Sequence, residues 1–256
     1  MKKILKISLV QFDIYWENID ENLKYLDYLL NNLKTDLIVL PEMFTTGFTP
    51  FPQKSQNHDN KKIIDWMMKI SKSKNSAICG STIFKVGDEF YNRFLFIHEN
   101  RIQHYDKKHL FSYGGESRNF KPGKSKTIID FHGWKICPQI CYDLRFPVWS
   151  RNTENYDLLL YVANWPEKRK EHWMSLLKAR SIENQSYVVG LNRVGRDEMG
   201  LVYSGDSLVF DPLGNELLHM NPLQNISEII VDKNLIESTR REFPFLLDKD
   251  NFNLNI

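Results

Sequence analysis

Apolar residues at the start of the chain follow first a strand pattern and then a helix pattern. Residues 5–12 form a mostly apolar run that predicts a buried strand, and apolar residues recur at helical spacing over 19–33. Asn18 is suited to cap that helix, with Glu21 as its capping partner. A further apolar run at 37–40 predicts a second strand, so the segment is typical of a βαβ unit.

The following segment predicts a helix and then a hairpin. The helix should span residues 59–71. Residues 76–84 and 90–98 resemble paired strands joined through Gly87 and Asp88. Because the hairpin strands are antiparallel and βαβ strands are parallel, the sheet should be mixed.

A further series of strands and helices begins at Trp134. Residues 134–140 predict a strand that contains Pro138, and because proline cannot donate to a ladder, this position should lie at an unpaired edge or a bulge. The other expected elements are a helix at 145–152, a strand at 157–163, a helix at 168–185, strands at 187–192, 207–210 and 227–231, a turn at 212–214 and a short helix near Leu235. We expect one layered α/β domain over residues 1–256, without internal repeats.

The composition is that of a folded protein with a substantial core. Hydrophobic residues make up 42% and charged residues 26% of the 256 positions, and the mean hydropathy is −0.44. The 34 basic and 32 acidic residues are interspersed and leave a formal net charge of +2. No one-signed field is therefore expected to attract nucleic acid or anionic lipid, and small partners are favoured.

The N-terminus and the cysteines favour a cytoplasmic protein. Polar residues interrupt the first apolar run, so no signal peptide is expected, and no stretch approaches the roughly 18 apolar residues of a membrane span. The three cysteines, Cys79, Cys137 and Cys141, are an odd number, which argues against a disulfide framework. Histidines and cysteines at zinc spacing are missing around them, so no metal site is expected.

Three chemically active side chains follow segments where a strand should end. Glu42 follows the second expected strand, Lys107 follows the strand-like residues 95–105, and Cys141 follows the strand that contains Pro138. Catalytic groups of α/β sheets tend to lie just beyond the carboxyl ends of strands. Each residue also has an ordinary alternative, as a solvated glutamate, an exposed lysine or a buried cysteine that acts as a small hydrophobe.

The segments around these residues resemble the signature regions of the nitrilase superfamily of carbon-nitrogen hydrolases. They are LPEMFTTGF, YDKKHLF and CYDLRFP, in that order. GESRNFKPG, ANWP, ARSIENQ, NRVG and DPLG also look like family elements, so the resemblance covers nearly the whole chain. Within the superfamily the chain is similar to the ω-amidases of bacteria and eukaryotes. The resemblance implies an α-β-β-α sandwich, a homodimer whose sheets stack across the interface into four layers, and no cofactor.

The resemblance further implies a catalytic triad of Glu42, Lys107 and Cys141. In this triad the thiolate attacks an amide carbon, the lysine ammonium lowers the pKa of the thiol, and the glutamate accepts the proton. Lys107 and the backbone N–H of Tyr142 would stabilise the oxyanion. Glu116 matches a second family glutamate that would position Lys107 and the substrate, and its alternative is a glutamate in a surface loop.

The implied substrates are 2-oxoglutaramate and 2-oxosuccinamate, which would be hydrolysed to the 2-oxo diacid and ammonia. Such a substrate carries a carboxylate far from its amide, and a planar arginine is suited to bind it. Arg145 is the candidate, although an ion pair with Asp143 or with a neighbouring helix is an alternative. Phe44, Tyr142 and Trp165 are candidate pocket walls, although aromatic residues more often belong to a core.

Other functions remain open on sequence alone. An aliphatic amidase, an N-carbamoyl amino-acid hydrolase or a nitrilase would use the same triad. A Cys-His peptidase would use His104 or His109, but no cysteine-protease signature surrounds Cys141. A catalytically silent binding protein on the same fold is disfavoured by the intact triad.

Overall fold

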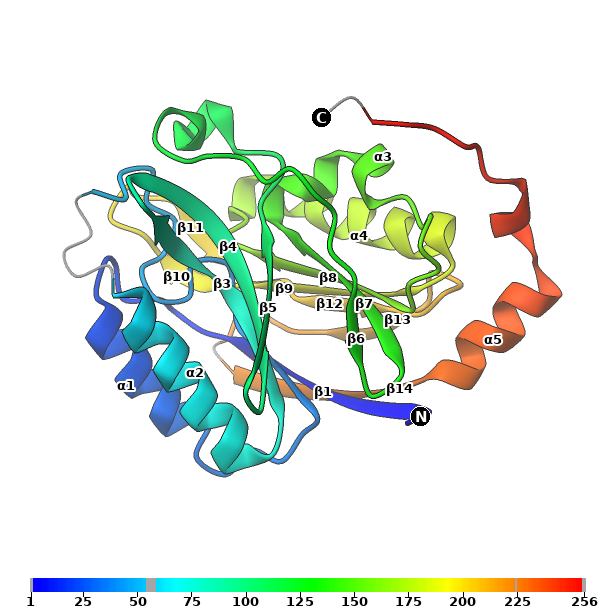
Figure 1. Cartoon of the computed structure of the whole chain (residues 1–256), viewed down its shortest axis with the longest axis horizontal. Helices are drawn as coiled ribbons and strands as arrows, with labels where there is room; N and C mark the ends of the chain where they lie inside the picture. The colour runs from blue at the N-terminus through cyan, green and yellow to red at the C-terminus, as the bar shows by residue number, and fades with distance from the viewer. Residues whose placement is uncertain (1, 54–58, 224, 255–256) are drawn as a thin grey trace.

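Two six-stranded sheets stack face to face and carry helices on their outer faces (Figure 1). The computed structural model describes residues 2–53, 59–223 and 225–254. One apolar cluster fills the space between the sheets, a second lies between the first sheet and its helices, and a third lies between the second sheet and its helix. This order of layers is the α-β-β-α sandwich that the sequence predicted.

The first sheet has the strand order β14-β1-β2-β3-β4-β5. Its central strands are parallel, as the βαβ pattern requires, and antiparallel strands flank them, so the sheet is mixed. The parallel strands are β1 (Ile4–Gln11), β2 (Leu37–Val39) and β3 (Ala77–Val86). The antiparallel strands are β4 (Glu89–His98), β5 (Arg101–Asp106) and β14 (Asn225–Asp232).

The second sheet repeats this arrangement with the order β13-β12-β9-β8-β7-β6. Its parallel strands are β7 (Trp134–Ile140), β8 (Leu158–Ala163) and β9 (Tyr187–Asn192). Its antiparallel strands are β6 (Ile129–Phe131), β12 (Leu208–Phe210) and β13 (Glu216–His219). A separate two-stranded hairpin consists of β10 (Val194–Arg196) and β11 (Val202–Ser204).

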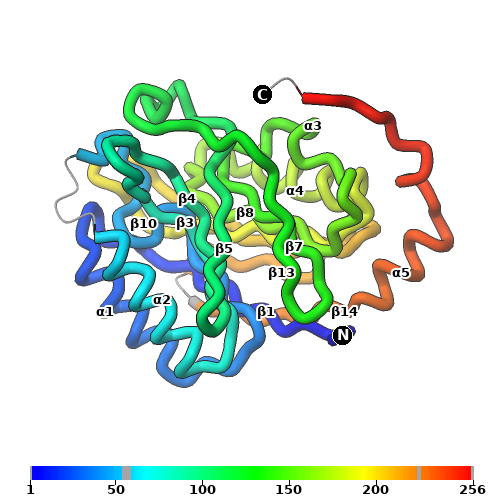
Figure 2. The backbone as a smooth tube through the Cα atoms, in the orientation of Figure 1, coloured from blue at the N-terminus to red at the C-terminus, as the bar shows by residue number. Residues whose placement is uncertain are grey.

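The helices begin at the capping residues that the sequence contains. Asn18 and Asp59 accept backbone hydrogen bonds at the starts of α1 (Ile19–Leu29) and α2 (Asn60–Lys74), which cover the first sheet. The second sheet is covered by α4 (Lys170–Asn184), and α3 (Pro147–Ser150) lies at its rim. Beyond α5 (Lys233–Glu242) the chain returns toward α3 (Figure 2), where Leu254 lines a groove with Val148 and Trp149.

Two expected elements differ in the structure, and local backbone signals explain both. Residues 95–105 do not form one strand, because Glu99 adopts a positive φ of 54° in a turn that separates β4 from β5. The expected helix at 145–152 is instead the 3₁₀ turn η3 (Cys141–Arg145) followed by the four residues of α3. Phe146 precedes Pro147 and is therefore held out of the helical region, after which the proline begins α3.

Pro138 occupies a position where it costs no ladder hydrogen bond. β6 pairs with β7 only over residues 134–136, so that edge of β7 is unpaired at Pro138, as expected for a proline within a strand. On its other side β7 pairs in parallel with β8. Pro138 therefore leaves the pairing of the central strands β7 and β8 intact.

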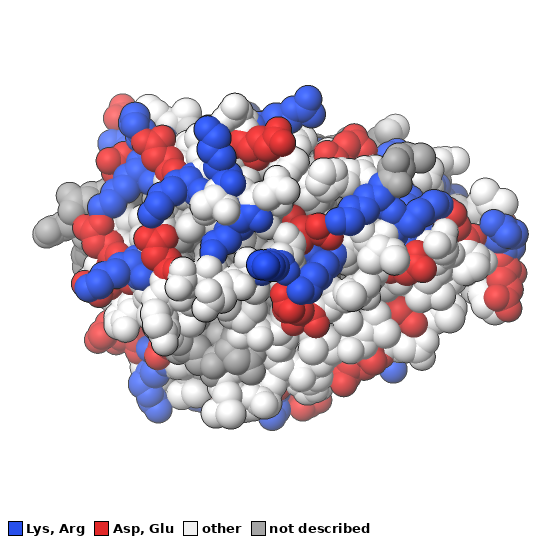
Figure 3. Space-filling model, turned by 90° about the horizontal axis from the view of Figure 1, so that it is seen from below, with Lys and Arg blue, Asp and Glu red and all other residues white. Residues whose placement is uncertain are grey.

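Basic and acidic side chains are interspersed on the face of the molecule drawn in Figure 3. Ion pairs on the surface of the chain include those of Lys62 with Asp20 and of Lys61 with Asp65. This face agrees with the expectation of no one-signed field. No helix within the described ranges is long and apolar enough to span a bilayer.

Candidate active site

Glu42, Lys107 and Cys141 meet at the rim where the two sheets come together. Glu42 lies just beyond β2 and Lys107 directly follows β5 of the first sheet, whereas Cys141 directly follows β7 of the second. The Lys107 ammonium lies 2.8 Å from Glu42 Oε1. The backbone N–H of Asn164 donates to Glu42 Oε2 at 2.8 Å, and the Asn164 carbonyl lies 3.9 Å from Cys141 Sγ. The site therefore depends on both sheets.

Lys107 is a buried cation enclosed by two carboxylates. Only 1% of its surface is exposed, and Glu42 and Glu116 are fully buried. Its ammonium lies 2.9 Å from Glu116 Oε2 and 3.2 Å from Oε1, in addition to the contact with Glu42. Asn92 donates its two amide hydrogens to the same pair of carboxylates, at 2.8 Å to Glu42 and 3.0 Å to Glu116. These contacts exclude the surface-loop alternatives for all three charged residues.

The two carboxylates keep the lysine charged despite its burial. Burial by itself lowers the pKa of Lys107, but the charges of Glu116 and Glu42 outweigh it and raise that pKa above its ordinary value. Burial also raises the pKa of Glu116, although Lys107 opposes this effect. The charge of the ammonium is therefore neutralised inside the cluster rather than by solvent.

Cys141 is held in a backbone conformation that few residues other than glycine adopt. Its φ is +44°, at the junction between β7 and η3, and its thiol is partly accessible, in contrast to the buried thiols of Cys79 and Cys137. Burial and the nearby Glu42 raise the pKa of the Cys141 thiol well above its ordinary value, although Lys107 lowers it. Lys107 thus lowers the pKa of the thiol, as expected, but desolvation and the Glu42 carboxylate outweigh its effect.

Asp143 joins the segment that carries Lys107 to the segment that carries Cys141. Its buried carboxylate accepts hydrogen bonds from Tyr105 Oη at 2.8 Å and from the backbone N–H groups of His109 at 2.9 Å and Ile140 at 3.0 Å. The His109 ring lies 2.8 Å from the same carboxylate. Four contacts to one side chain thus fix the spacing between the end of β5 and the end of β7.

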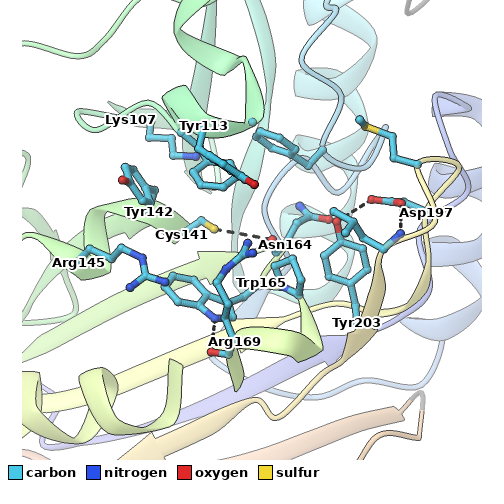
Figure 4. A pocket seen from close by; sticks show the side chains of 16 residues that line it. Lys107, Tyr113, Cys141, Tyr142, Arg145, Asn164, Trp165, Arg169, Asp197 and Tyr203 are labelled. Atoms are coloured by element: carbon cyan, nitrogen blue, oxygen red, sulfur yellow. Dashed lines mark hydrogen bonds between the residues drawn. The ribbon is translucent and has the colours of Figure 1, made fainter. Parts of the chain in front are cut away.

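A cavity of about 240 Å³ opens above Cys141 (Figure 4). Tyr142, Arg145 and Trp165 line it, as the sequence predicted, together with Lys107. Its other lining residues are Phe48, Phe111, Tyr113, Gly114, Asn164, Pro166, Arg169, Asp197, Met199, Leu201 and Tyr203. The cavity thus combines aromatic walls with two arginines, and the thiol and the lysine lie at its inner end.

Phe44 does not line this cavity, contrary to expectation. It is fully buried in the cluster between the first sheet and its helices, with its ring 6.1 Å from that of Trp66 on α2. Met43, the residue before it, has a positive φ of 44°, and Phe44 donates its backbone N–H to Ser81 on β3. The turn after Glu42 therefore directs the Phe44 ring into the core.

Arg145 lies in the cavity rather than in the ion pair with Asp143 that the sequence left open. Its guanidinium lies over the Trp165 ring, 4.7 Å from the centroid, and Nη2 lies 3.2 Å from His172 Nδ1 on α4. Asp143 is instead occupied by the donors described above. The sequence also left open an ion pair between Arg145 and a neighbouring helix. Arg145 does contact the helix α4, but through a histidine and not through a carboxylate.

Several residues of the site were not predicted, and only some gave a signal in the sequence. Asn92 interrupts the apolar residues of a predicted strand, which marks a buried polar position. Asn164 and Arg169 follow the strand that ends at Ala163, the same strand-end signal that indicated Glu42 and Cys141. Tyr203 comes from the short hairpin β10–β11, for which no periodic pattern exists.

Neither histidine of the peptidase alternative reaches the thiol. His109 stacks on Phe146 with ring centroids 3.8 Å apart and its ring contacts Asp143. Neither His109 nor His104 is among the residues that line the cavity.

Within residues 2–53, 59–223 and 225–254, no group of three or more His, Cys, Asp or Glu side chains is arranged to hold a metal ion.

The sequence of the chain matches the carbon-nitrogen hydrolase family over residues 6–241. Omega-amidase YafV of Yersinia enterocolitica is 42% identical over 252 residues, which cover 97% of this chain and 98% of that protein. The 2-oxoglutaramate amidase of Bacillus subtilis is 31% identical over 251 residues, which cover 94% of this chain and 96% of that protein.

Solved structures show the same fold. A CN-hydrolase superfamily protein from Xanthomonas campestris, with an arsenic adduct in its active site, superimposes with a TM-score of 0.95 at 36% identity and covers 99% of this chain and 100% of its own. A carbon-nitrogen hydrolase from Helicobacter pylori gives a TM-score of 0.83 at 20% identity, with 96% and 95% of the two chains covered, and shows the fold alone.

Replacement of Lys107 tests the charge balance of the buried cluster. Lys107→Met leaves two buried carboxylates without a cation and should lower the free energy of unfolding by about 3–5 kcal/mol at neutral pH. Burial already raises the pKa of Glu116, and loss of the ammonium raises it further. A carboxyl group with a raised folded-state pKa stabilises below its unfolded pKa and loses that contribution as the pH rises, so acidification should restore part of the stability.

Urea unfolding of wild type and variant between pH 5 and pH 8 measures this difference. Lys108→Met is the matched control, because the Lys108 ammonium lies over the Trp149 ring and contacts no buried carboxylate; it should cost at most about 1 kcal/mol at either pH. Equal losses in the two variants, or a loss for Lys107→Met that does not shrink in acid, would contradict the charge balance described above.

Proposed function

Because the chain belongs to the carbon-nitrogen hydrolase family of the nitrilase superfamily and is an amidohydrolase, we propose that it is an ω-amidase. Its substrates are the ω-amides of short 2-oxo dicarboxylic acids, 2-oxoglutaramate and 2-oxosuccinamate, and its products are the 2-oxo diacid and ammonia. The observation that carries this proposal is a cavity with Cys141 and Lys107 at one end and Arg145 in its wall. The named activities of the two relatives above support it.

Cys141 is the nucleophile and Glu42 the general base. The raised pKa of the thiol keeps it protonated at neutral pH, so its proton passes to Glu42 as Sγ attacks the amide carbon. Glu42 is held for this step by the Asn92 amide and the Asn164 backbone N–H. The new bond is the C–S bond of a tetrahedral adduct, and the former carbonyl oxygen becomes negatively charged.

Lys107 stabilises that oxyanion together with the backbone N–H of Tyr142. A charged donor placed in advance at such an oxygen contributes roughly 3–4 kcal/mol to the stability of the transition state. Glu116 holds the ammonium through both of its oxygens and does not contact the reacting atoms itself. Glu116 is therefore a positioning residue for Lys107 in this mechanism.

Glu42 acts a second time as the adduct collapses. The C–N bond breaks, Glu42 returns its proton to the nitrogen, and ammonia leaves a thioester on Cys141. A water molecule then attacks the thioester carbon while Glu42 accepts its proton, and the C–S bond breaks to release the acid and restore the thiol. No external acid, base or cofactor is required.

Arg145 binds the carboxylate at the far end of the substrate. A planar guanidinium can donate two parallel hydrogen bonds to a carboxylate, and the stacking of Arg145 on Trp165 leaves the N–H groups that do not face His172 available for this contact. Tyr142 and Trp165 form walls around the chain between the two ends. The alternative is another superfamily amidase, such as an aliphatic amidase, an N-carbamoyl amino-acid hydrolase or a nitrilase, which would use the same triad.

The cellular setting that we propose is the cytoplasm. All three cysteines are unpaired, and a working thiol requires a reducing compartment. The relatives named above as ω-amidases come from bacteria.

We also propose that the enzyme is a homodimer. The groove lined by Val148, Trp149 and Leu254 has two exposed apolar side chains, Val148 and Leu254, which a partner could cover. Trp149 is already buried within its own chain and does not contribute to this argument. Light scattering at micromolar concentration should give twice the 30.3 kDa mass of one chain. A mass of one chain under these conditions would reject the dimer and leave the chemistry unaffected.

The nucleophile assignment predicts a single acylated cysteine. Rapid acid quench of the enzyme with excess 2-oxoglutaramate should trap a thioester, and peptide mass spectrometry should place it on Cys141. Cys79→Ala and Cys137→Ala remove buried thiols away from the cavity and should still form the adduct, whereas Cys141→Ala should not. An adduct on Cys79 or Cys137 would overturn the assignment.

Replacement of Arg145 tests how the substrate is anchored. Arg145→Ala and Arg145→Lys should both lose most of kcat/KM for 2-oxoglutaramate, because a lysine cannot reproduce the bidentate contact. The kcat/KM of the variants for a neutral short amide should change little. If kcat/KM falls equally for the carboxylated and the neutral amide, Arg145 has a structural role. If it falls for neither, another residue binds the substrate carboxylate. A wild-type enzyme that hydrolyses a neutral amide or a nitrile far better than 2-oxoglutaramate would reject the ω-amidase proposal but not the triad.

A further inference from the structure

A second arginine, Arg169, lines the same cavity as Arg145 and is oriented in a similar way. The Arg145 guanidinium lies 4.7 Å from the Trp165 ring centroid, and the Arg169 guanidinium lies 5.6 Å from that of Phe111. In Figure 4 both side chains extend into the space beside Cys141. The indole N–H of Trp165 donates to the Arg169 carbonyl at 2.8 Å, so Trp165 contacts both arginines.

Neither guanidinium is neutralised by the carboxylates of the site. Among the described residues, no ion pair joins Arg145 or Arg169 to an Asp or Glu. Asp197 also lines the cavity, but its two oxygens accept hydrogen bonds from the Tyr203 hydroxyl at 2.7 Å and the Leu201 backbone N–H at 2.8 Å. Glu42 and Glu116 are occupied by Lys107. The outer part of the cavity therefore carries two cations whose charges are not balanced by the surrounding side chains.

Two features preorganise this pair for an anion. A guanidinium that lies on an aromatic face keeps its N–H groups, which lie in its own plane, free to donate. Arg169 is also the residue directly before α4, so the positive end of that helix dipole adds to its charge. Two such cations held in one small cavity repel each other, and a bound anion relieves this repulsion.

We propose that Arg145 and Arg169 form a two-arginine clamp for the 2-oxo-carboxylate end of the substrate. Arg145 binds the carboxylate, and Arg169 donates to the 2-oxo oxygen and to the carboxylate oxygen beside it. This inference rests on the proposed function, since it assumes that the ω-amide lies at Cys141 and the charged end at Arg145. Arg169 then determines specificity for the group at carbon 2.

The clamp also predicts that amides of amino acids bind poorly. Glutamine differs from 2-oxoglutaramate only at carbon 2, where it carries an ammonium in place of the oxo group. In the clamp that ammonium would lie against two cations, with no free carboxylate among the lining residues to receive it. Like-charge contact and the loss of solvation both oppose its binding.

A series of five-carbon amides separates these contributions. The substrates are 2-oxoglutaramate, glutaramate without the oxo group, glutamine with an ammonium, and pentanamide without either charged or oxo group. The variants are Arg169→Met, Arg169→Lys and Arg169→Glu, with Arg145→Met for comparison. The matched control is Arg241→Met, because Arg241 is exposed on α5 and does not line the cavity.

Arg169→Met should lower the ratio of kcat/KM for 2-oxoglutaramate to that for glutaramate by about 10- to 100-fold, the value of one hydrogen bond to a charged donor. In Arg169→Met, kcat/KM for pentanamide should fall least. Arg169→Lys should recover part of the ratio of kcat/KM for 2-oxoglutaramate to that for glutaramate. Arg145→Met should lower kcat/KM for 2-oxoglutaramate and for glutaramate by the same factor. Arg169→Glu should raise kcat/KM for glutamine relative to that for 2-oxoglutaramate by about tenfold or more. Arg241→Met should change none of these kcat/KM ratios.

The outcomes distinguish this inference from the function on which it rests. A wild-type enzyme that prefers 2-oxoglutaramate while Arg169→Met leaves the oxo-to-deoxy ratio unchanged would overturn the clamp alone. Equal losses for all four substrates in Arg169→Met would show a structural role and would also overturn it. A wild-type enzyme that prefers neither 2-oxoglutaramate nor glutaramate over pentanamide would reject the proposed function and the clamp with it.

Discussion

The burial of one ammonium group determines how the rim of the first sheet and the loop that follows β5 must be arranged. A lysine removed from water is stable as a cation only if carboxylates surround it closely, and here two carboxylates contact Lys107 Nζ within 3.2 Å. One comes from the end of β2 and the other from the turn η2 (Glu116–Arg118). Asn92, in the middle of β4, holds both carboxylates at once. The alignment of these elements is thus fixed by charge as well as by the apolar core.

The site changes in character from its inner end to its mouth. At the inner end, Lys107 is paired with two carboxylates, and burial raises the pKa of the Cys141 thiol. Toward the mouth, aromatic rings support arginines whose charges are not paired with carboxylates. The inner end is therefore suited to break an amide bond, and the outer part is suited to select the group attached to it.

The sequence predicted the strand-end residues of the site better than the residues between them. Glu42 and Cys141 follow apolar runs, and this local signal needs no knowledge of tertiary structure. The role of Asn92 depends on two side chains from other elements, and the orientation of Phe44 depends on the positive φ of Met43. Burial likewise decided the pKa of Cys141, and burial is a property of the folded chain. Short strands such as β10 and β11 contain too few residues to show a period.

The hydrogen bonds of Asp143 have a consequence for how such an enzyme can diverge. Because one buried carboxylate joins the backbone of His109 to that of Ile140, the loop of the lysine and the loop of the thiol cannot be remodelled independently. Two of the side chains that line the outer cavity, Met199 and Tyr113, are largely exposed. Exchange of such exposed wall residues can therefore alter the shape of the outer cavity while the distance between lysine and thiol stays the same.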